Sequence, residues 1–458
     1  NPSVSALNTI AGKTAGVVTA TLATGNTASY SALSTASTDV ITININDNPS
    51  VADLNTIAGK TAGVVTATLA TGNTASYSAL NTAATDDITI NINDNPSVTN
   101  LNTIAGKTAG VVTATLATGA LSTFSALSTS GTDQITVNVN DANGVDLNAT
   151  DLSALGAKTA AAVNVTEAVD ISGTTAEVTA ALVTTGSLVL VADANVSISD
   201  NPTISELNDI AAKTTGVVTA TLASTAAADL ASLSTAATDV ITISVSDTIS
   251  VSALNTLAGK TAGVVTATAT TGDTASFSSL ATDSNDVITI NINDNPSVSA
   301  LNTIAGKTAG VVTATLASTA KADLVALSTA STDVITVPVS DTVSVTELNA
   351  IAGKTGGPVT ATVTTGNTAS FSALATDSND IITINISDNP SVSDLNTIAG
   401  KTGGVVTATL ATGNTASYSA LNTAATDDIT ININDNPSVA DLNTIAGKTA
   451  GVVTATLA

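Results

Sequence analysis

The sequence lacks the residues that carry most enzyme chemistry. Its 458 residues include no Cys, His, Met or Trp, and all eleven basic residues are Lys. Without His or Cys there is no common group that titrates near neutral pH, no thiolate nucleophile and no zinc site of the usual kind. Cations that prefer oxygen ligands, calcium above all, remain the one plausible cofactor. The composition therefore predicts that the protein is not an enzyme.

Positive charge and long apolar runs are also scarce. The formal net charge is -25, whereas binding to a phosphate backbone needs a basic stripe. We therefore expect no nucleic-acid partner. A helix that crosses a bilayer needs about 20 consecutive apolar residues, and no such run is present. We expect no membrane insertion.

What the sequence does contain is a repeat. The motif Asn-Pro-Ser-Val at Asn1 returns at Asn48 and Asn95, with a period of 47 residues. Eight blocks of this length begin at Asn1, Asn48, Asn95, Asn201, Thr248, Asn295, Thr342 and Asn389, and a further copy begins at Asn436. We expect the sequence to be a window of a longer array. A fixed period of this length is typical of solenoids, in which each repeat buries its apolar face against its neighbours.

A divergent block interrupts the regular ones. It covers residues 142–200 and is longer than 47 residues. We predict one continuous repeat domain, with regular repeats over 1–141 and 201–458 and an enlarged repeat that continues the solenoid over 142–200. The enlargement is expected between about Ala168 and Asn195, as a larger coil or a small bulging loop.

Each period contains two similar halves. Shifting the first block by 23 residues lays residues 16–22 on residues 39–45. Each half has a short segment with apolar residues at i, i+3 and i+6, followed by a segment that alternates with period two. These patterns predict one helix and one strand per coil of 23 to 24 residues. In the first block the helices are expected at Val4 to Ala11 and, with a weaker signal, at Ala28 to Thr35.

Residues at the expected helix ends support this reading. Ser344 with Glu347 and Thr203 with Glu206 match the capping box, in which both side chains bind backbone amides at a helix start. The recurring Ala-Gly-Lys-Thr, first seen with Gly12, predicts a left-handed turn at the glycine and a lysine beside the last helix carbonyls.

The strand pattern decides the fold class. Ile41, Ile43 and Ile45 alternate with Thr42 and Asn44. Strands covered on both faces would instead read as continuous apolar runs. We therefore predict an α/β fold, a right-handed solenoid with one parallel sheet and short helices on one face. A β-solenoid is the alternative, because eight-residue helices rich in Thr are marginal.

Two residue types occupy fixed registers. The six aromatic residues are expected to plug the core beneath the second helix; they are Tyr30, Tyr77, Phe124, Phe277, Phe371 and Tyr418. Ten of the eleven lysines share another register and are expected to be solvated helix-end charges paired with a nearby Asp; they are Lys13, Lys60, Lys107, Lys158, Lys213, Lys260, Lys307, Lys354, Lys401 and Lys448.

Asp and Asn side chains cluster where the second strand of each block ends. If stacked coils bring these carboxylates into rows, they form candidate calcium sites. The candidate ligands are Asp47, Asp94, Asp294, Asp388 and Asp435. The alternative is that they make turns and cap the next helix. Two further acidic groups are not candidate sites. The segment from Asp283 to Asp286 is expected to be a solvated loop, and the pair Asp86 and Asp87 is expected to add little to function.

The motif from Ser391 to Thr409, SVSDLNTIAGKTGGVVTAT, resembles the repeats of giant secreted or cell-surface proteins of bacteria, marine cyanobacteria among them. The resemblance implies an extracellular or cell-surface location, an association with calcium, and roles as surface layers, fibres or adhesins. We expect an extracellular structural repeat protein that builds a long rod, filament or surface layer, with other copies or further repeats as partners. The alternative is an adhesin that recognises glycan or calcium through its Thr/Asn sheet face or its Asp/Asn rows.

Overall fold

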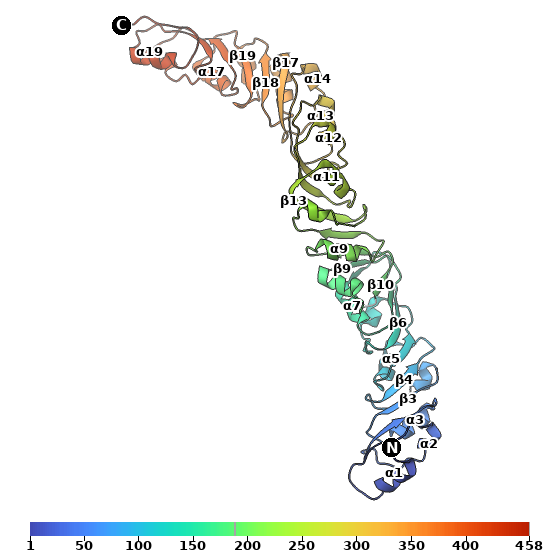
Figure 1. Cartoon of the computed structure of the whole chain (residues 1–458). Helices are drawn as coiled ribbons and strands as arrows, with labels where there is room; N and C mark the ends of the chain where they lie inside the picture. Colours follow the sequence, from blue (N-terminus) through green and yellow to red (C-terminus); the bar gives the residue numbers. More distant parts are fainter. Residues whose placement is uncertain (187–188, 458) are drawn as a thin grey trace. The chain divides into compact units, whose positions relative to one another are not determined.

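The computed structural model describes residues 1–186 and 189–457, which form two compact units. Unit 1 contains residues 1–223, 233–242 and 260–262, and unit 2 contains residues 224–232, 243–259 and 263–458. Short helices and strands alternate along the chain within each unit (Figure 1).

The regular coils of unit 1 each pair one helix with one strand. In chain order their elements are α1 (Val4–Ala11), β1 (Thr19–Thr21), α2 (Thr27–Tyr30), β2 (Val40–Asn44), α3 (Val51–Ala58), β3 (Val65–Thr68), α4 (Thr74–Tyr77), β4 (Asp87–Asn91), α5 (Val98–Ala105), β5 (Val112–Thr115), α6 (Leu121–Phe124) and β6 (Gln134–Val139). Eight-residue helices thus alternate with one-turn helices.

The divergent block, also in unit 1, has more strands per coil. Its elements are β7 (Asp146–Asn148), α7 (Ala149–Gly156), β8 (Val163–Val165), β9 (Asp170–Gly173), α8 (Thr175–Val178), the π-helical turn η1 (Thr179–Val183), β10 (Val189–Val191) and β11 (Asn195–Ile198). The regular pattern then resumes with α9 (Ile204–Ala211), β12 (Val218–Thr221) and β13 (Val240–Ile249). The expected enlargement between residues 168 and 195 is therefore a larger coil; residues 187 and 188 lie outside the described residues.

Unit 2 returns to one helix and one strand per coil. Its elements after the start of β13 are α11 (Val251–Ala258), β14 (Val265–Ala269), α12 (Thr274–Ser278), β15 (Val287–Asn291), α13 (Val298–Ala305), β16 (Val312–Thr315), α14 (Lys321–Leu324), β17 (Val334–Val343), α15 (Val345–Ala352), β18 (Val359–Val363), α16 (Thr368–Ser372), β19 (Ile381–Asn385), α17 (Val392–Ala399), β20 (Val406–Thr409), α18 (Thr415–Tyr418), β21 (Asp428–Asn432), α19 (Val439–Ala446) and β22 (Val453–Thr454), and α10 (Ala227–Leu230) precedes them.

All strand pairs are parallel, and neighbours in sequence are mostly neighbours in space. In unit 2 the order follows the chain from β13 to β22. In unit 1 one sheet has the order β1-β2-β3-β4-β5-β6-β8-β10, and a second begins β7-β9-β11-β12. The prediction of an α/β solenoid is confirmed, and the helices exclude the β-only alternative. The prediction of one sheet is wrong, because β7 and β9 of the divergent block start a second ladder beside the first.

The predicted bounds are correct for the long helix α1, whereas the short helix α2 was predicted to be longer than it is. Helix α1 has the expected bounds, and both expected capping boxes are present, with a third at Thr174 and Glu177. Helix α2 ends at Tyr30 rather than near Thr35. The backbone beyond it is bound elsewhere, because the side chain of Asn8 bonds to both Ala32 and Ser34.

The expected left-handed turn at Gly12 is wrong. Gly12 has φ -71° and ψ -5°, a right-handed conformation, and its amide bonds to carbonyls of α1. Among the described residues the one glycine with positive φ is Gly144 in the divergent block. A different glycine is sterically required: a Cβ on Gly63 would lie 2.5 Å from the carbonyl oxygen of Ile41 on the neighbouring strand. The same close approach recurs at Gly110, Gly310, Gly357, Gly404 and Gly451.

The core is formed by the inward face of the strands, by the buried face of the long helices and by the aromatic or leucine of each short helix. Ile41 and Ile43 are fully buried, and Tyr30 is 3 % exposed. The prediction that the aromatic register is core is confirmed at all six positions. The Tyr30 hydroxyl lies 2.5 Å from the carbonyl oxygen of Ala23, so this buried phenol has a hydrogen-bond partner. Burial raises the pKa of Tyr30 above its usual value.

Candidate functional site

The five predicted calcium ligands are held by threonine. Asp47 Oδ1 accepts hydrogen bonds from the backbone amide of Thr27 at 2.8 Å and from its hydroxyl at 2.6 Å. The equivalent pairs are Asp94 with Thr74, Asp294 with Thr274, Asp388 with Thr368 and Asp435 with Thr415. The threonine hydroxyl lowers the pKa of Asp47, Asp94, Asp388 and Asp435.

These threonine contacts contradict the interpretation that the aspartates cap the next helix, and they do not test calcium binding. The aspartate binds the first residue of the short helix 20 positions earlier, while the next long helix has its own serine cap, Ser50 in the case of α3. The idea that these residues cap the next helix is therefore wrong. Each aspartate lies in its own block, and within residues 1–186 and 189–457 no three acidic side chains gather in a way that could hold a metal ion. Calcium binding stays a prediction.

A second set of aspartates is buried and bridges successive coils. Asp39 is 3 % exposed; its Oδ1 accepts from the amide of Val18 at 2.8 Å and its Oδ2 from the amide of Ala36 at 2.9 Å. The same two bonds are made by Asp86, Asp133, Asp239, Asp286, Asp333, Asp380 and Asp427. Burial raises the pKa of Asp133.

Sequence reasoning missed these aspartates. Asp286 was assigned to a solvated loop and Asp86 was given no importance, and both interpretations are wrong, because the two side chains are 7 % and 3 % exposed. A signal was available: an Asp stands directly before the second strand in all eight regular blocks.

Buried threonines complete the connection between coils. The Thr61 hydroxyl oxygen accepts from the amide of Ile41 at 2.7 Å and from that of Gly63 at 2.8 Å, and lies 3.0 Å from the carbonyl oxygen of Asp39. The Thr35 hydroxyl donates to the carbonyl of Lys60 at 2.6 Å. Both contacts join residues of adjacent coils.

Helix asparagines make a third kind of bridge. The amide nitrogen of Asn8 donates to the carbonyl of Ala32 at 2.8 Å, and its amide oxygen accepts from Ser34 at 2.9 Å. The same pair of bonds to the next coil is made by Asn55, Asn102, Asn255, Asn302, Asn349 and Asn396. Sequence reasoning assigned these residues no role.

The lysine register is at helix ends, but its partners are carbonyls. Lys307 Nζ lies 2.5 Å from the carbonyl oxygen of Leu280 and 3.0 Å from that of Ser278, at the end of α12 in the preceding coil. Lys354 and Lys401 bind the ends of α14 and α16 similarly. The expected pairing with Asp is wrong for these lysines. The ion pair recorded in the described part of the chain joins Lys321 and Glu347 at 3.1 Å.

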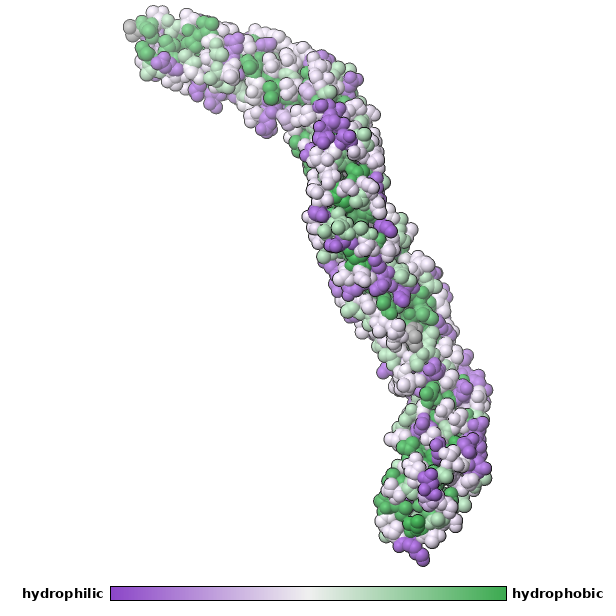
Figure 2. Space-filling model, in the orientation of Figure 1, coloured by the Kyte–Doolittle hydropathy of each residue, from purple (hydrophilic) through white to green (hydrophobic). Residues whose placement is uncertain are grey.

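The outer face of the strands is open, as predicted. Thr68 and Thr89 are exposed and lie opposite each other on β3 and β4, while Asn44 lies opposite Thr66. Ten cross-strand threonine pairs occur among the described strands, at Thr21 and Thr42, Thr68 and Thr89, Thr115 and Thr136, Thr221 and Thr242, Thr248 and Thr268, Thr268 and Thr289, Thr315 and Thr336, Thr342 and Thr362, Thr362 and Thr383, and Thr409 and Thr430. On the face shown in Figure 2, hydrophilic and hydrophobic residues alternate in small areas.

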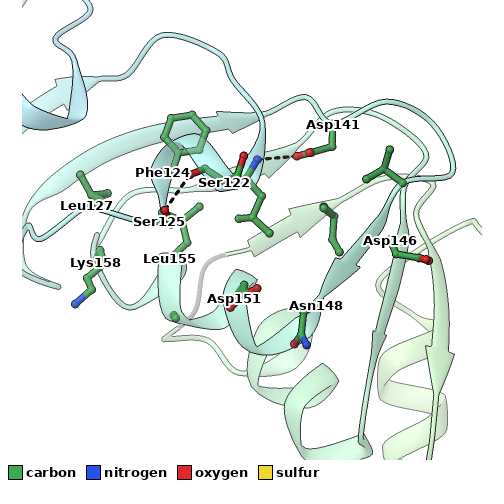
Figure 3. A pocket seen from close by; sticks show the side chains of 14 residues that line it. Ser122, Phe124, Ser125, Leu127, Asp141, Asp146, Asn148, Asp151, Leu155 and Lys158 are labelled. Carbon is green, nitrogen blue, oxygen red and sulfur yellow. Dashed lines mark hydrogen bonds between the residues drawn. The ribbon is translucent and has the colours of Figure 1, made fainter.

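One pocket of about 540 Å³ lies within unit 1, where the divergent block begins (Figure 3). Helix α6, strand β7 and helix α7 form its walls. Its apolar residues include Leu121, Phe124, Leu127, Leu147 and Leu155. Its polar residues are Ser122, Ser125, Asp141, Asp146, Asn148, Asp151 and Lys158. Asp141 Oδ2 accepts from the amide of Leu121 at 2.7 Å.

The fold and the bridging side chains define the protein as an α/β solenoid built from two-coil repeats of about 47 residues. No family model, no curated protein and no solved structure matches the chain. Within the described residues, no helix has the length and apolar character needed to cross a lipid bilayer.

Proposed function

We propose that this chain is an extracellular structural repeat protein, whose coils build a rod, filament or surface layer together with other copies or further repeats. One observation carries the proposal: polar side chains at four recurring positions of the regular blocks are bound to neighbouring coils. Asn8, Thr35, Asp39 and Thr61 each bridge residues at least 20 positions apart.

The energetics of these bridges favour a structural role. A hydrogen bond contributes about 0.5 to 1.5 kcal/mol net, and loss of one partner of a buried pair costs about 1 to 3 kcal/mol. In a solenoid the stability is approximately the sum of repeat terms and nearest-neighbour terms. Several bridges per period therefore strengthen the neighbour terms, and such coupling lets each unit resist separation of its coils.

Composition supports the proposed location. A fold that needs no disulfide and no metal thiolate has a stability that does not depend on the redox state of its surroundings. A net charge of -25 opposes non-specific aggregation. The resemblance to repeats of secreted and cell-surface bacterial proteins points the same way.

Electron microscopy tests the proposal. The native protein, examined on and around the cells that produce it, is expected to form continuous fibres or a regular layer outside the cell. Labelling confined to the cell interior, or dispersed molecules at every protein concentration tried, would contradict it.

The second candidate is an adhesin or binding module. The pocket in the divergent block favours it, because Phe124 and the Asp and Asn side chains around it combine an apolar wall with polar groups, as ligand sites commonly do. A glycan array separates the two candidates: saturable binding of one glycan class favours adhesion, and its absence together with ordered fibres favours the structural role.

A further inference from the structure

The pocket at the start of the divergent block arises from two departures from the repeat. In the regular blocks three residues, most often Asn-Pro-Ser, join the strand-end Asp to the next helix, whereas residues 142–148 stand between Asp141 and α7 and include β7. Leu121 stands where Thr27 and Thr74 begin the short helix in other blocks, and its side chain is 9 % exposed and lines the pocket. A longer connection and a larger apolar residue thus create a hollow specific to this block.

The pocket has an apolar floor. Phe124, Leu127 and Leu155 are 2 %, 4 % and 5 % exposed and belong to α6, the turn that follows it, and α7. A cavity of about 540 Å³ falls in the range of about 300 to 1,000 Å³ that holds small organic ligands. Its volume and floor therefore suit an apolar body of moderate size.

The polar groups are unevenly distributed around this floor. Asp141 and Asp146 lie on one side of the pocket, and Lys158 lies on the opposite side, with Asp151 between them (Figure 3). Three carboxylates against one ammonium group make the site negative, and the net charge of -25 adds to the attraction for cations. Lys158 repels a cation from its own side, so it would direct a cationic group towards Asp151.

Strand β7 adds a second feature. It pairs with β9 on one edge, and among the described strands none pairs with its other edge. Asp146, Leu147 and Asn148 of this strand line the pocket. An extended segment could add to this open edge and place a side chain in the hollow.

We propose that this pocket binds an organic cation, a primary ammonium group carried on an apolar body. The apolar body lies on Phe124, Leu127 and Leu155, and the ammonium group faces Asp151. The same chemistry is carried by a free alkylamine and by a lysine side chain of an extended peptide. This binding role is separate from the structural role of the regular blocks.

Dansylcadaverine is a suitable probe, because it joins an apolar fluorophore to a primary ammonium group and its fluorescence rises in apolar surroundings. The full chain has no Trp to interfere. We expect saturable binding of one probe per chain, with displacement by hexylamine and much weaker displacement by hexanol or hexanoate. Equal displacement by hexanol would overturn the proposal, because the carboxylates would then contribute nothing.

Variants locate the site. Asp151→Asn is expected to weaken binding about two- to fivefold, the range for one exposed charge pair, and Lys158→Gln to strengthen it by a similar factor. Ala154→Phe places a large side chain from an exposed position of α7 into the pocket and is expected to abolish binding. Asp53→Asn is the matched control for Asp151→Asn. Asp53 is the third residue of α3, as Asp151 is of α7, and its substitution removes the same charge far from the pocket. Equal weakening by Asp53→Asn would show diffuse attraction and overturn the proposal.

A Val-Lys-Val peptide separates the two sources of the cation. Tighter binding of the peptide than of hexylamine supports addition to the open edge of β7, and tighter binding of the amine supports a small-molecule ligand. Failure of both ligands to displace the probe overturns the proposal, whereas the structural role of the repeat would be unaffected.

Discussion

The carboxylate of Asp39 accepts a hydrogen bond from the backbone amide of Val18, 21 residues earlier, at a distance of 2.8 Å. Its other oxygen accepts from the amide of Ala36 in its own coil at 2.9 Å. One buried side chain therefore fixes a strand of the preceding coil and the turn that leads into its own strand. This relationship recurs in every regular block, and its removal is the most direct test of how the coils hold together.

Asp86→Asn is expected to destabilise unit 1. Asp86 accepts from the amides of Val65 and Ala83, both at 2.8 Å. An amide side chain can offer one acceptor oxygen, so its NH₂ group would face one of these donors. We expect a loss of about 1 to 3 kcal/mol, measured as a lower urea midpoint and as faster hydrogen exchange at the amide of Val65.

The adjacent residue provides the control. Asp87 is exposed on the outer face of β4, opposite Thr66. Asp87→Asn removes the same charge and is expected to change stability by less than about 0.5 kcal/mol. Equal effects of the two substitutions would mean that charge rather than the buried bridge stabilises this coil.

The threonine contacts of the strand-end aspartates predict a pH dependence. The hydroxyl of Thr74 is the largest cause of the lowered pKa of Asp94. A carboxylate with a lowered folded-state pKa contributes stability above its unfolded pKa of about 4, and this contribution is lost as the pH falls through the folded value. Thr74→Val should therefore raise the pKa of Asp94 and leave that of Asp388, which has its own threonine, unchanged. Carboxyl ¹³C NMR titration measures both.

Asp133 is expected to behave in the opposite way. Burial raises its pKa, so the folded state binds a proton more readily than the unfolded state. The stability that Asp133 contributes to the folded state is fully present below its unfolded pKa of about 4. It is lost as the pH rises through the raised folded pKa. In the same titration Asp133 should change protonation at a higher pH than Asp94. The reverse order would contradict the assigned burial of Asp133 and exposure of Asp94.

The period and its division into two coils could be predicted because they follow from apolar spacing alone. Alternation in residues such as Ile41, Thr42 and Ile43 determines which strand face is buried, and this signal is local. The roles of Asp39, Thr61 and Asn8 could not be predicted in this way. Each depends on which backbone groups a neighbouring coil presents some 20 to 26 residues away, and local pattern does not contain that register.

The strand pairing of the divergent block likewise could not be predicted from local sequence pattern. Its helix pattern around Leu152 was recognisable, but the second sheet begins because β7 pairs with β9, a contact between two short strands of three and four residues. Polar residues such as Asp146 and Asn148 give such a strand little sequence signal. The pocket lined by β7 was for that reason outside what the sequence could indicate.

The calcium prediction has a direct thermal test. A cation that binds the folded state alone stabilises it by RT ln(1 + c/Kd) at a free cation concentration c, and so raises the melting temperature. If Asp94 and its equivalents are ligands, the protein should melt at a higher temperature in calcium than in EDTA, and Asp94→Asn should reduce the difference. Magnesium at equal ionic strength controls for charge screening. An unchanged melting temperature in EDTA would exclude these residues as ligands in a stabilising site.

Two glycines of the block that begins at Asn389, Gly400 and Gly404, differ in how much room they leave for a side chain. A Cβ on Gly404 would lie 2.5 Å from the carbonyl oxygen of Ile382 on the adjacent strand, whereas a Cβ on Gly400 would meet no atom outside its neighbours closer than 3.5 Å. Gly404→Ala must push strands β19 and β20 apart, and we expect a loss of about 1 to 3 kcal/mol, as for other overpacked sites. Gly400→Ala, in a right-handed conformation at the end of α17, is expected to cost less than about 1 kcal/mol. Urea denaturation of both variants measures the difference, and the reverse ranking would refute the assigned contact between the coils.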